Sequence, residues 1–414
     1  MKVFRTLGSS MLVVVVGCAE PDSASAPRPE HVLADVTVID GTGSVPKPGQ
    51  TIEITNERIT AIRPTLPGEE GTVDVAGSFV TPGLIDAHVH LPSDRELLAA
   101  ALDSMLSLGI TSTRHMSASP DHSLFLADDS SRFTRLYRSA YWAGPSYMRD
   151  DLRVREAYAA AERDPLLLAV TDTTDLDVAV REARERGVAG IKMYSDLEPE
   201  LVRAVAASAR EAGMRVWSHA VVFPTKPSVV AASGVHVMSH AAFFVWEGSA
   251  ELPPAYNGPH PWSPFGPPAP YETVSHDDPA VVAVLETMRD RGVILDPTIT
   301  LMSFLSEQSR TWAVELTRLA HAMGIPIATG TDAALLFDEI EALINDVGLT
   351  PLEALASATS VGAAAIGVDD DLGSLEVSKV ADLVVYPADP SVDITVLRRP
   401  SHVIKGGVLV RPRD

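Results

Sequence analysis

The chain has little cysteine and little positive charge. Its 414 residues include one cysteine, Cys18, so no disulfide can form within the chain. Its 33 lysines and arginines are outnumbered by 55 acidic residues, which gives a formal net charge of −22 at pH 7. Such a surface would repel a polyanion, and this excludes nucleic acid as a partner. Hydrophobic residues make up 46% of the chain, enough for one large domain and a small companion.

The apolar run near the N-terminus, residues 11–16, is too short to span a bilayer. Lys2 and Arg5 precede it, as in a signal peptide. The run leads into Val-Val-Gly-Cys at residues 15–18, which resembles a bacterial lipobox. We therefore expect cleavage before Cys18 and acylation of this residue. A plain secretory signal and a buried thiol are the alternatives.

On this interpretation the N-terminal region is not part of the fold. Residues 1–17 would be a lipoprotein signal peptide, and residues 18–30, rich in Ser, Ala and Pro, would be the acylated cysteine and a flexible tether. The protein would then be lipid-anchored in the bacterial cell envelope, facing the periplasm or the outer surface.

The most informative motif is an apolar stretch, residues 80–91, that contains two histidines one residue apart. Alternate side chains of a strand lie on the same face, so His88 and His90 can hold one metal ion between them. Taken alone, such a pair is about as often two packing or surface histidines. The metal-binding interpretation is favoured here because further residues of ligand type follow along the chain.

Each of these further residues lies at the end of a short apolar segment. Each segment is followed by a helix-like stretch, which is typical of a parallel (β/α)8 TIM-type barrel with its chemistry at the carboxyl ends of the strands. One ligand from each strand end would converge on one point. The residues are Lys192, His219, His240 and Asp332.

Two flanking segments instead contain short apolar strands separated by Gly, Pro and Asn turns, typical of antiparallel pairing. Because neither segment is large enough alone, we expect residues 31–80 and 372–414 to combine into one small composite β-sandwich. The barrel would occupy residues 81–371. Within it, residues 243–275 are dense in proline and aromatics, and a loop of this length usually forms a lid or a substrate wall.

Over residues 34–410 the chain resembles the amidohydrolase superfamily, in particular its imidazolonepropionase-like and metal-dependent dipeptidase branch. The likeness rests on Pro-Gly-Leu-Ile-Asp-Ala-His-Val-His at residues 82–90 and on the segment 373–385 that follows the barrel. The resemblance implies the same barrel and composite β-sandwich. It also implies an enzyme, a metal-dependent amidohydrolase.

The resemblance implies two divalent metals, expected to be zinc. His88, His90 and Asp332 would hold the more buried metal. His219 and His240 would hold the second. A metal-bound water has a pKa of about 7, which makes hydroxide available near neutrality. Asp332 would take the proton as hydroxide attacks an amide carbonyl, and would return it to the leaving nitrogen.

The number of metal ions that the site can hold depends on the chemical state of Lys192. A protonated ammonium beside two dications would be disfavoured. The resemblance implies instead that Lys192 is carboxylated and bridges both metals. A surface lysine is the alternative, and it would leave a single metal.

The chain departs from the family pattern at two places. Residues 219–221 read His-Ala-Val, without the Tyr or His that relatives carry at the third position to reach the substrate carbonyl. Residues 113–115 read Thr-Arg-His where Thr-Val-Arg-Asp is usual. Stabilisation of the oxyanion must then come from a metal, from Tyr194 or from His115.

The leading hypothesis is hydrolysis of the C–N bond of a small-molecule amide, either a dipeptide or an N-acyl amino acid. One alternative is the opening of a cyclic amide of the imidazolone type. Another is a non-catalytic lipoprotein that binds a solute or a metal. The lipid anchor would be the sole membrane contact, and a homo-oligomer is compatible with the sequence.

Replacing Cys18 with serine should block both processing and acylation, because serine offers no thiol to the diacylglycerol group. Mass spectrometry of mature protein from the native host should find a diacylglycerol on wild-type Cys18 and none on the variant. Wild-type protein without this mass would exclude the anchor.

Overall fold

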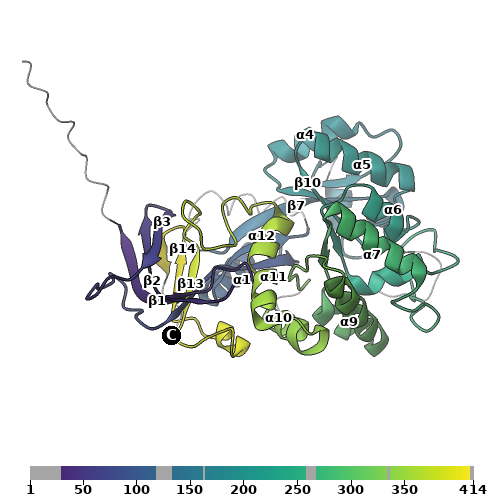
Figure 1. The fold of residues 1–414 in the computed structure, drawn as a ribbon. Helices are drawn as coiled ribbons and strands as arrows, with labels where there is room; N and C mark the ends of the chain where they lie inside the picture. The colour runs from purple at the N-terminus through teal and green to yellow at the C-terminus, as the bar shows by residue number, and fades with distance from the viewer. Residues whose placement is uncertain (1–28, 118–132, 162–163, 258–266, 333–335, 411–414) are drawn as a thin grey trace, which may run out of the picture.

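The computed structural model describes residues 29–117, 133–161, 164–257, 267–332 and 336–410. Cys18 and the expected signal peptide lie outside these ranges. The described chain forms a β domain, built from both ends of the sequence, and a barrel between them (Figure 1).

Strands from the two ends of the chain pair in one mixed sheet, in the order β15-β14-β13-β4-β1-β2-β3. The pairing of β4 with β13 joins the N-terminal segment to the C-terminal one. This confirms that both ends of the chain combine into one separate β domain, and the described strands of the predicted β-sandwich form a single sheet. They are β1 (His31–Val38), β2 (Lys47–Thr55), β3 (Arg58–Pro64), β4 (Phe79–Pro82), β13 (Leu383–Tyr386), β14 (His402–Lys405) and β15 (Val408–Val410).

The β domain has its own apolar core. Leu33 of β1 and Ile52 of β2 are register partners, and both are fully buried. Leu383 of β13 and Ile404 of β14 are partners in the same way. Alternate side chains of each strand thus form one cluster that spans both ends of the chain.

The barrel strands run parallel, in the order β12-β11-β10-β9-β7-β6-β5, with β8 paired to β7. This confirms the predicted TIM-type barrel. The strands are β5 (Leu84–Val89), β6 (Ile110–His115), β7 (Arg135–Ala143), β8 (Leu167–Ala169), β9 (Gly190–Met193), β10 (Arg215–His219), β11 (Val237–Ser239) and β12 (Ile294–Asp296).

A further segment, residues 326–332, closes the barrel between β12 and β5. On one side it forms a parallel bridge with β12 through Ile327. On the other, the N–H of Ala87 donates to the Thr329 carbonyl at 2.9 Å, and the N–H of Asp332 donates to the His88 carbonyl at 2.7 Å. The last strand-like segment of the barrel therefore lies against the first strand.

Helices follow most of the barrel strands and cover them (Figure 1). No helix in the described ranges is long and apolar enough to cross a membrane. The α-helices are α1 (Arg95–Ser107), α2 (Pro145–Asp150), α3 (Arg155–Ala160), α4 (Leu176–Glu185), α5 (Pro199–Glu211), α6 (Pro227–Ala232), α7 (Pro279–Arg291), α8 (Ile299–Leu305), α9 (Glu307–Ala322), α10 (Leu336–Ala342), α11 (Pro351–Ser357) and α12 (Ser360–Ile366). The other helical elements are two 3₁₀-helices, η2 (Ala241–Glu247) and η4 (Ile394–Arg398), and one π-helix, η3 (Leu343–Val347).

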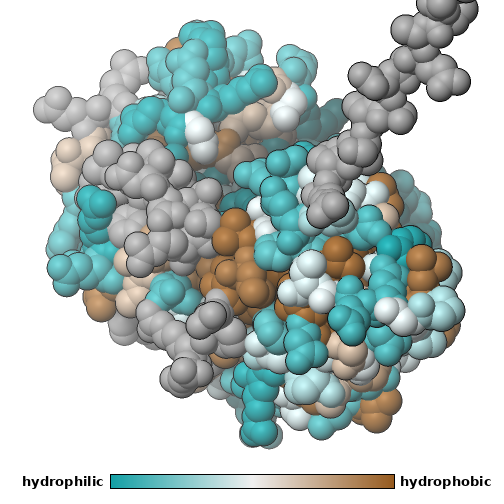
Figure 2. Space-filling model, turned by 90° about the vertical axis from the view of Figure 1, so that its left-hand side faces the viewer, coloured by the Kyte–Doolittle hydropathy of each residue, from teal (hydrophilic) through white to brown (hydrophobic). Residues whose placement is uncertain are grey.

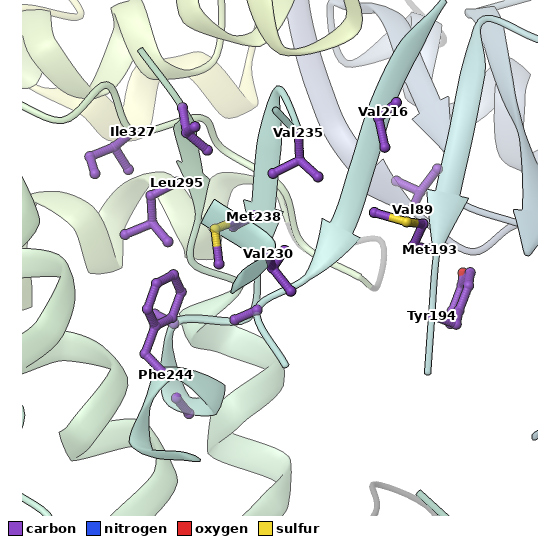
Figure 3. Close-up of a cluster of buried hydrophobic side chains, with 14 of the residues drawn as sticks. Val89, Met193, Tyr194, Val216, Val230, Val235, Met238, Phe244, Leu295 and Ile327 are labelled. Atoms are coloured by element: carbon purple, nitrogen blue, oxygen red, sulfur yellow. The ribbon is translucent and has the colours of Figure 1, made fainter. Parts of the chain in front are cut away.

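Apolar side chains fill the space between the barrel strands and the covering segments. Val216, Met238 and Leu295 come from the neighbouring strands β10, β11 and β12 (Figure 3). Val230 of α6 and Phe244 of η2 lie in the same cluster, and all five are fully buried. Each such side chain contributes about 1.5–3 kcal/mol through burial.

The face shown in Figure 2 is mostly hydrophilic, in line with the high net charge of the chain.

A buried carboxylate links α8 to α10. Glu339 is fully buried and accepts the N–H groups of Ile299 and Thr300, both at 2.7 Å. These are first-turn N–H groups of α8, which have no partner within the helix. The link fixes α8 in place, and Leu301 and Leu305 of this helix line the cavity described below.

Candidate metal centre

Three side chains of ligand type meet where β5 and the closing segment end. The Nε2 atoms of His88 and His90 lie 3.6 and 2.9 Å from Oδ1 of Asp332. Ligand atoms of these three residues all lie within 4.8 Å of one another. This spacing allows one metal ion to contact all three, as the sequence predicts.

His219 and His240, at the ends of β10 and β11, extend this cluster. The His240 ring lies 5.1 Å from the ring of His88 and 4.8 Å from that of His219, centroid to centroid. Nε2 of His240 is 4.0 Å from Oδ2 of Asp332. The barrel therefore brings these two predicted ligands beside the first three.

Hydrogen bonds hold two of the imidazoles in one orientation. Nδ1 of His88 lies 2.6 Å from Oδ2 of Asp296, and Nδ1 of His240 lies 2.9 Å from the Thr298 hydroxyl. In both rings Nε2 is then the atom that faces Asp332. A histidine held at Nδ1 in this way presents Nε2 to a metal.

The electrostatics of the cluster favour metal-binding protonation states. Burial lowers the pKa of His88, and it lowers the pKa values of His219 and His240 well below their usual range. These imidazoles are therefore neutral near pH 7, the form that binds metal. Burial alone would raise the pKa of Asp332, but His90 and His88 hold it well below its usual value. Its carboxyl group is ionised.

Lys192, on β9, is fully buried, which excludes the surface position considered as the alternative. Its Nζ donates to the Ser239 hydroxyl at 2.9 Å, and this hydroxyl donates to Oδ2 of Asp296 at 2.9 Å. Burial lowers the pKa of Lys192 to about 7. A substantial fraction of its amine is therefore neutral near pH 7.

The residues predicted to stabilise an oxyanion lie beside the cluster and contact the backbone. The Tyr194 hydroxyl donates to the Met116 carbonyl. Nδ1 of His115 accepts the Leu91 N–H at 3.1 Å, and the His115 ring lies 6.2 Å from that of His90. These contacts do not test a role in catalysis, so both residues remain predictions.

Two buried carboxylates beside the predicted ligands, Asp296 and Asp86, are not among the residues that the sequence predicts. Asp296 ends β12 after an apolar stretch, the same signal that singled out the other ligand-type residues. Asp86 lies two residues before His88, and burial raises its pKa well above the usual value. It accepts the His88 N–H at 3.1 Å and the Thr331 hydroxyl at 2.9 Å, so it ties together the two segments that carry the ligands.

A cavity of about 300 Å³ opens over the cluster. Four predicted ligands line it: His90, His219, His240 and Asp332. Phe243 and Tyr256 line it as well, and both belong to the proline-rich and aromatic-rich segment that follows His240. This segment is therefore part of the cavity wall, and its role as a substrate wall stays a prediction.

A family model for the amidohydrolase family matches residues 79–410. The chain belongs to this family. It is therefore a metal-dependent hydrolase that acts on C–N bonds. The imidazolonepropionase of Symbiobacterium thermophilum is 27% identical over 404 residues, which cover 90% of each chain.

Solved structures share the fold of this amidohydrolase. A Xaa-Pro dipeptidase with bound methionine in the active site has a TM-score of 0.70 and 21% identity, over 92% of this chain and 99% of the other. The ochratoxinase of A. niger has a TM-score of 0.73 and 18% identity, over 94% and 97% of the two chains. At these identities the likeness establishes the fold alone.

The donor set fits the divalent metal that the family implies. It consists of imidazole nitrogens and a carboxylate oxygen within 4.8 Å of one another, at the mouth of a cavity. Such ligands suit zinc and similar transition metals. His88 and His240 are also already held through Nδ1, which reduces the rearrangement that metal binding requires.

Asp296→Asn should weaken metal binding about tenfold to a hundredfold, because the charge that supports His88 is lost while the shape is kept. Competition with a chromophoric chelator would measure the affinity. Asp290→Asn is the matched control, since the Asp290 side chain is 66% exposed on α7. Equal affinity of Asp296→Asn and wild type would show that Asp296 does not support the centre.

Proposed function

We propose that this amidohydrolase cleaves the amide bond of a dipeptide or an N-acyl amino acid at a two-zinc centre. The observation that carries the proposal is the cluster of histidines around Asp332 at a cavity large enough for a small amide. The proposed ligands are His88, His90, Lys192, His219, His240 and Asp332.

Bound zinc ions would lower the pKa of a coordinated water and polarise the substrate carbonyl. The protein supplies the remaining functions. His88 and His240 are oriented by Asp296 and Thr298, so their Nε2 atoms need little movement to bind. Tyr194 and Phe243 line the cavity beside His219 and restrict access of bulk water.

Asp332 is the proposed proton carrier. It is ionised, its side chain is 15% exposed, and it lines the cavity, so a substrate can reach it. One carboxylate in this position can accept a proton in the first half of the reaction and give it to the leaving nitrogen in the second.

Lys192 is the proposed bridge between the two metals. Carboxylation by carbon dioxide requires a neutral amine, and the lowered pKa of this buried lysine provides one. The product would be an anion, which suits a position between two cations better than an ammonium group does.

A cyclic amide of the imidazolone type is the second candidate substrate. It is favoured by the identity of 27% to an imidazolonepropionase along 90% of both chains. The same groups would serve, since ring opening also breaks a C–N bond of an amide.

We further propose that the protein is lipid-anchored in the bacterial cell envelope. The proposal rests on the Val-Val-Gly-Cys sequence at residues 15–18, together with Lys2 and Arg5 before the apolar run.

Asp332→Asn should reduce kcat about 10²- to 10⁴-fold, because the amide can still contact a metal but cannot carry the proton. Metal-loaded protein would be screened against dipeptides, N-acyl amino acids and cyclic amides, and elemental analysis would measure the retained metal. Asp338→Asn is the control, since Asp338 is an exposed residue of α10. Wild-type turnover by Asp332→Asn with full metal content would exclude Asp332 as the proton carrier.

A further inference from the structure

The cavity over the cluster of predicted metal ligands also contains an arginine. Arg153 lies between α2 and α3 and lines the same cavity as His219 and Asp332. Among the described residues of the lining, it carries the only permanent positive charge. Burial favours the neutral form, but the surrounding Tyr147, Tyr256 and Asp151 keep the pKa of Arg153 well above its usual value. The group is therefore cationic near neutral pH.

A rigid set of contacts holds the guanidinium in place. Asp151, which is almost completely buried, accepts Nε at 2.9 Å and Nη2 at 2.7 Å. Nη2 also donates to the Tyr147 hydroxyl at 2.8 Å. The guanidinium carbon lies 5.4 Å from the centre of the Tyr256 ring. Such contacts pre-organise an arginine, so less freedom is lost when it binds a ligand.

Donor capacity remains after these contacts. A guanidinium has five N–H donors, and the bonds to Asp151 and Tyr147 use three of them. The other two are on Nη1, and among the described residues the Tyr256 hydroxyl is a further hydrogen-bond partner of Arg153. The Arg153 side chain is 46% exposed although Asp151 is buried. A guanidinium that lines a cavity and has N–H donors left for a ligand is suited to an anionic ligand.

Arg153 and four predicted metal ligands line one cavity of about 300 Å³, so one small substrate can contact both. The Tyr194 ring lies 4.8 Å from that of His219, and the Tyr147 ring lies 6.0 Å from that of Tyr194. Arg153 in turn lies 6.0 Å from the centre of the Tyr147 ring. Two aromatic rings thus separate the guanidinium from a predicted ligand. The charge of Arg153 is also among those that lower the pKa of His219.

The walls beside Arg153 are apolar. Val154 and Ala157, which follow it in the chain, line the cavity together with Leu167 of β8. A group that binds next to the guanidinium would therefore have its uncharged part against aliphatic side chains.

We propose that Arg153 binds a free carboxylate of the substrate, so that this amidohydrolase selects amides of amino acids with an unblocked carboxyl group and an apolar side chain. This inference rests on the proposed amide hydrolysis and narrows its substrate class. Arg153 would act in binding and specificity, and Asp151 would position it.

Matched substrate pairs test the inference. Each dipeptide or N-acyl amino acid with an apolar C-terminal residue would be compared with its carboxamide, using metal-loaded protein. Wild type should have a kcat/KM at least tenfold higher for the free acid. In Arg153→Met the ratio of the two values should fall about 10- to 100-fold, because charge-assisted hydrogen bonds to the carboxylate are lost. Arg153→Lys should fall in between, since it keeps the charge without the planar fork.

Arg149→Met is the matched control. Arg149 belongs to α2, its side chain is 66% exposed, and it pairs with the neighbouring Asp150. It should keep the wild-type ratio. A ratio near one in wild type, or an equal loss of both activities in Arg153→Met, would overturn the inference and leave amide hydrolysis in place. Metal-loaded wild type that hydrolyses none of the pairs would instead contradict the proposed function itself. If Arg153→Met does not fold, the wild-type ratio of kcat/KM for free acid and carboxamide still tests the selection of a free carboxylate.

Discussion

The hydrogen bond from the Asp332 N–H to the His88 carbonyl, at 2.7 Å, is the contact on which the rest of the centre depends. It closes the barrel and, in the same step, places the carboxylate of the last strand-like segment against the histidines of the first strand. The approach is tight, because a Cβ atom on Gly330 would lie 2.3 Å from Oδ1 of Asp296 and 2.6 Å from Cβ of His88. Only glycine fits at this position. Asp332 itself adopts a left-handed conformation with φ of 57°, as do His240 and Thr298 nearby, and such residues cost about 1–3 kcal/mol each. The surrounding structure holds strained backbone where the ligands are needed.

Beneath the predicted ligands lies a layer of buried polar groups joined by hydrogen bonds and one ion pair. Asp296 connects His88 to Ser239, and Ser239 connects onward to Lys192. Arg114, also fully buried, lies 3.6 Å from Asp296 and stacks over Trp217. Buried charges are tolerated when each has partners of this kind, and removal of one partner leaves an uncompensated charge. The layer therefore connects the amine of Lys192 to the ring of His88 through hydrogen bonds within the barrel interior.

The sequence predicts the barrel and the ligand-type residues because each signal is local. The change from an apolar stretch to His88, His219 or Asp332 shows in the sequence where a strand ends. Parallel strands then bring their carboxyl ends to one edge. Other features depend on packing that no local pattern reveals. The support of His88 by Asp296 joins residues 208 positions apart. Arg153 lies in a short connection between two helices, and only the fold places it in the same cavity as the predicted metal ligands. The same holds for the composite β domain, whose presence was predictable but whose single sheet follows from the pairing of β4 with β13.

The proposed metal pair is tested most directly by anomalous diffraction from crystals of zinc-loaded protein grown with bicarbonate. We expect two anomalous peaks, one among His88, His90 and Asp332 and one beside His219 and His240, with density for a carboxylated Lys192 between them. A single peak next to an unmodified Lys192 would contradict the two-metal centre, and the absence of any peak at His88 and His90 would contradict the metal site itself.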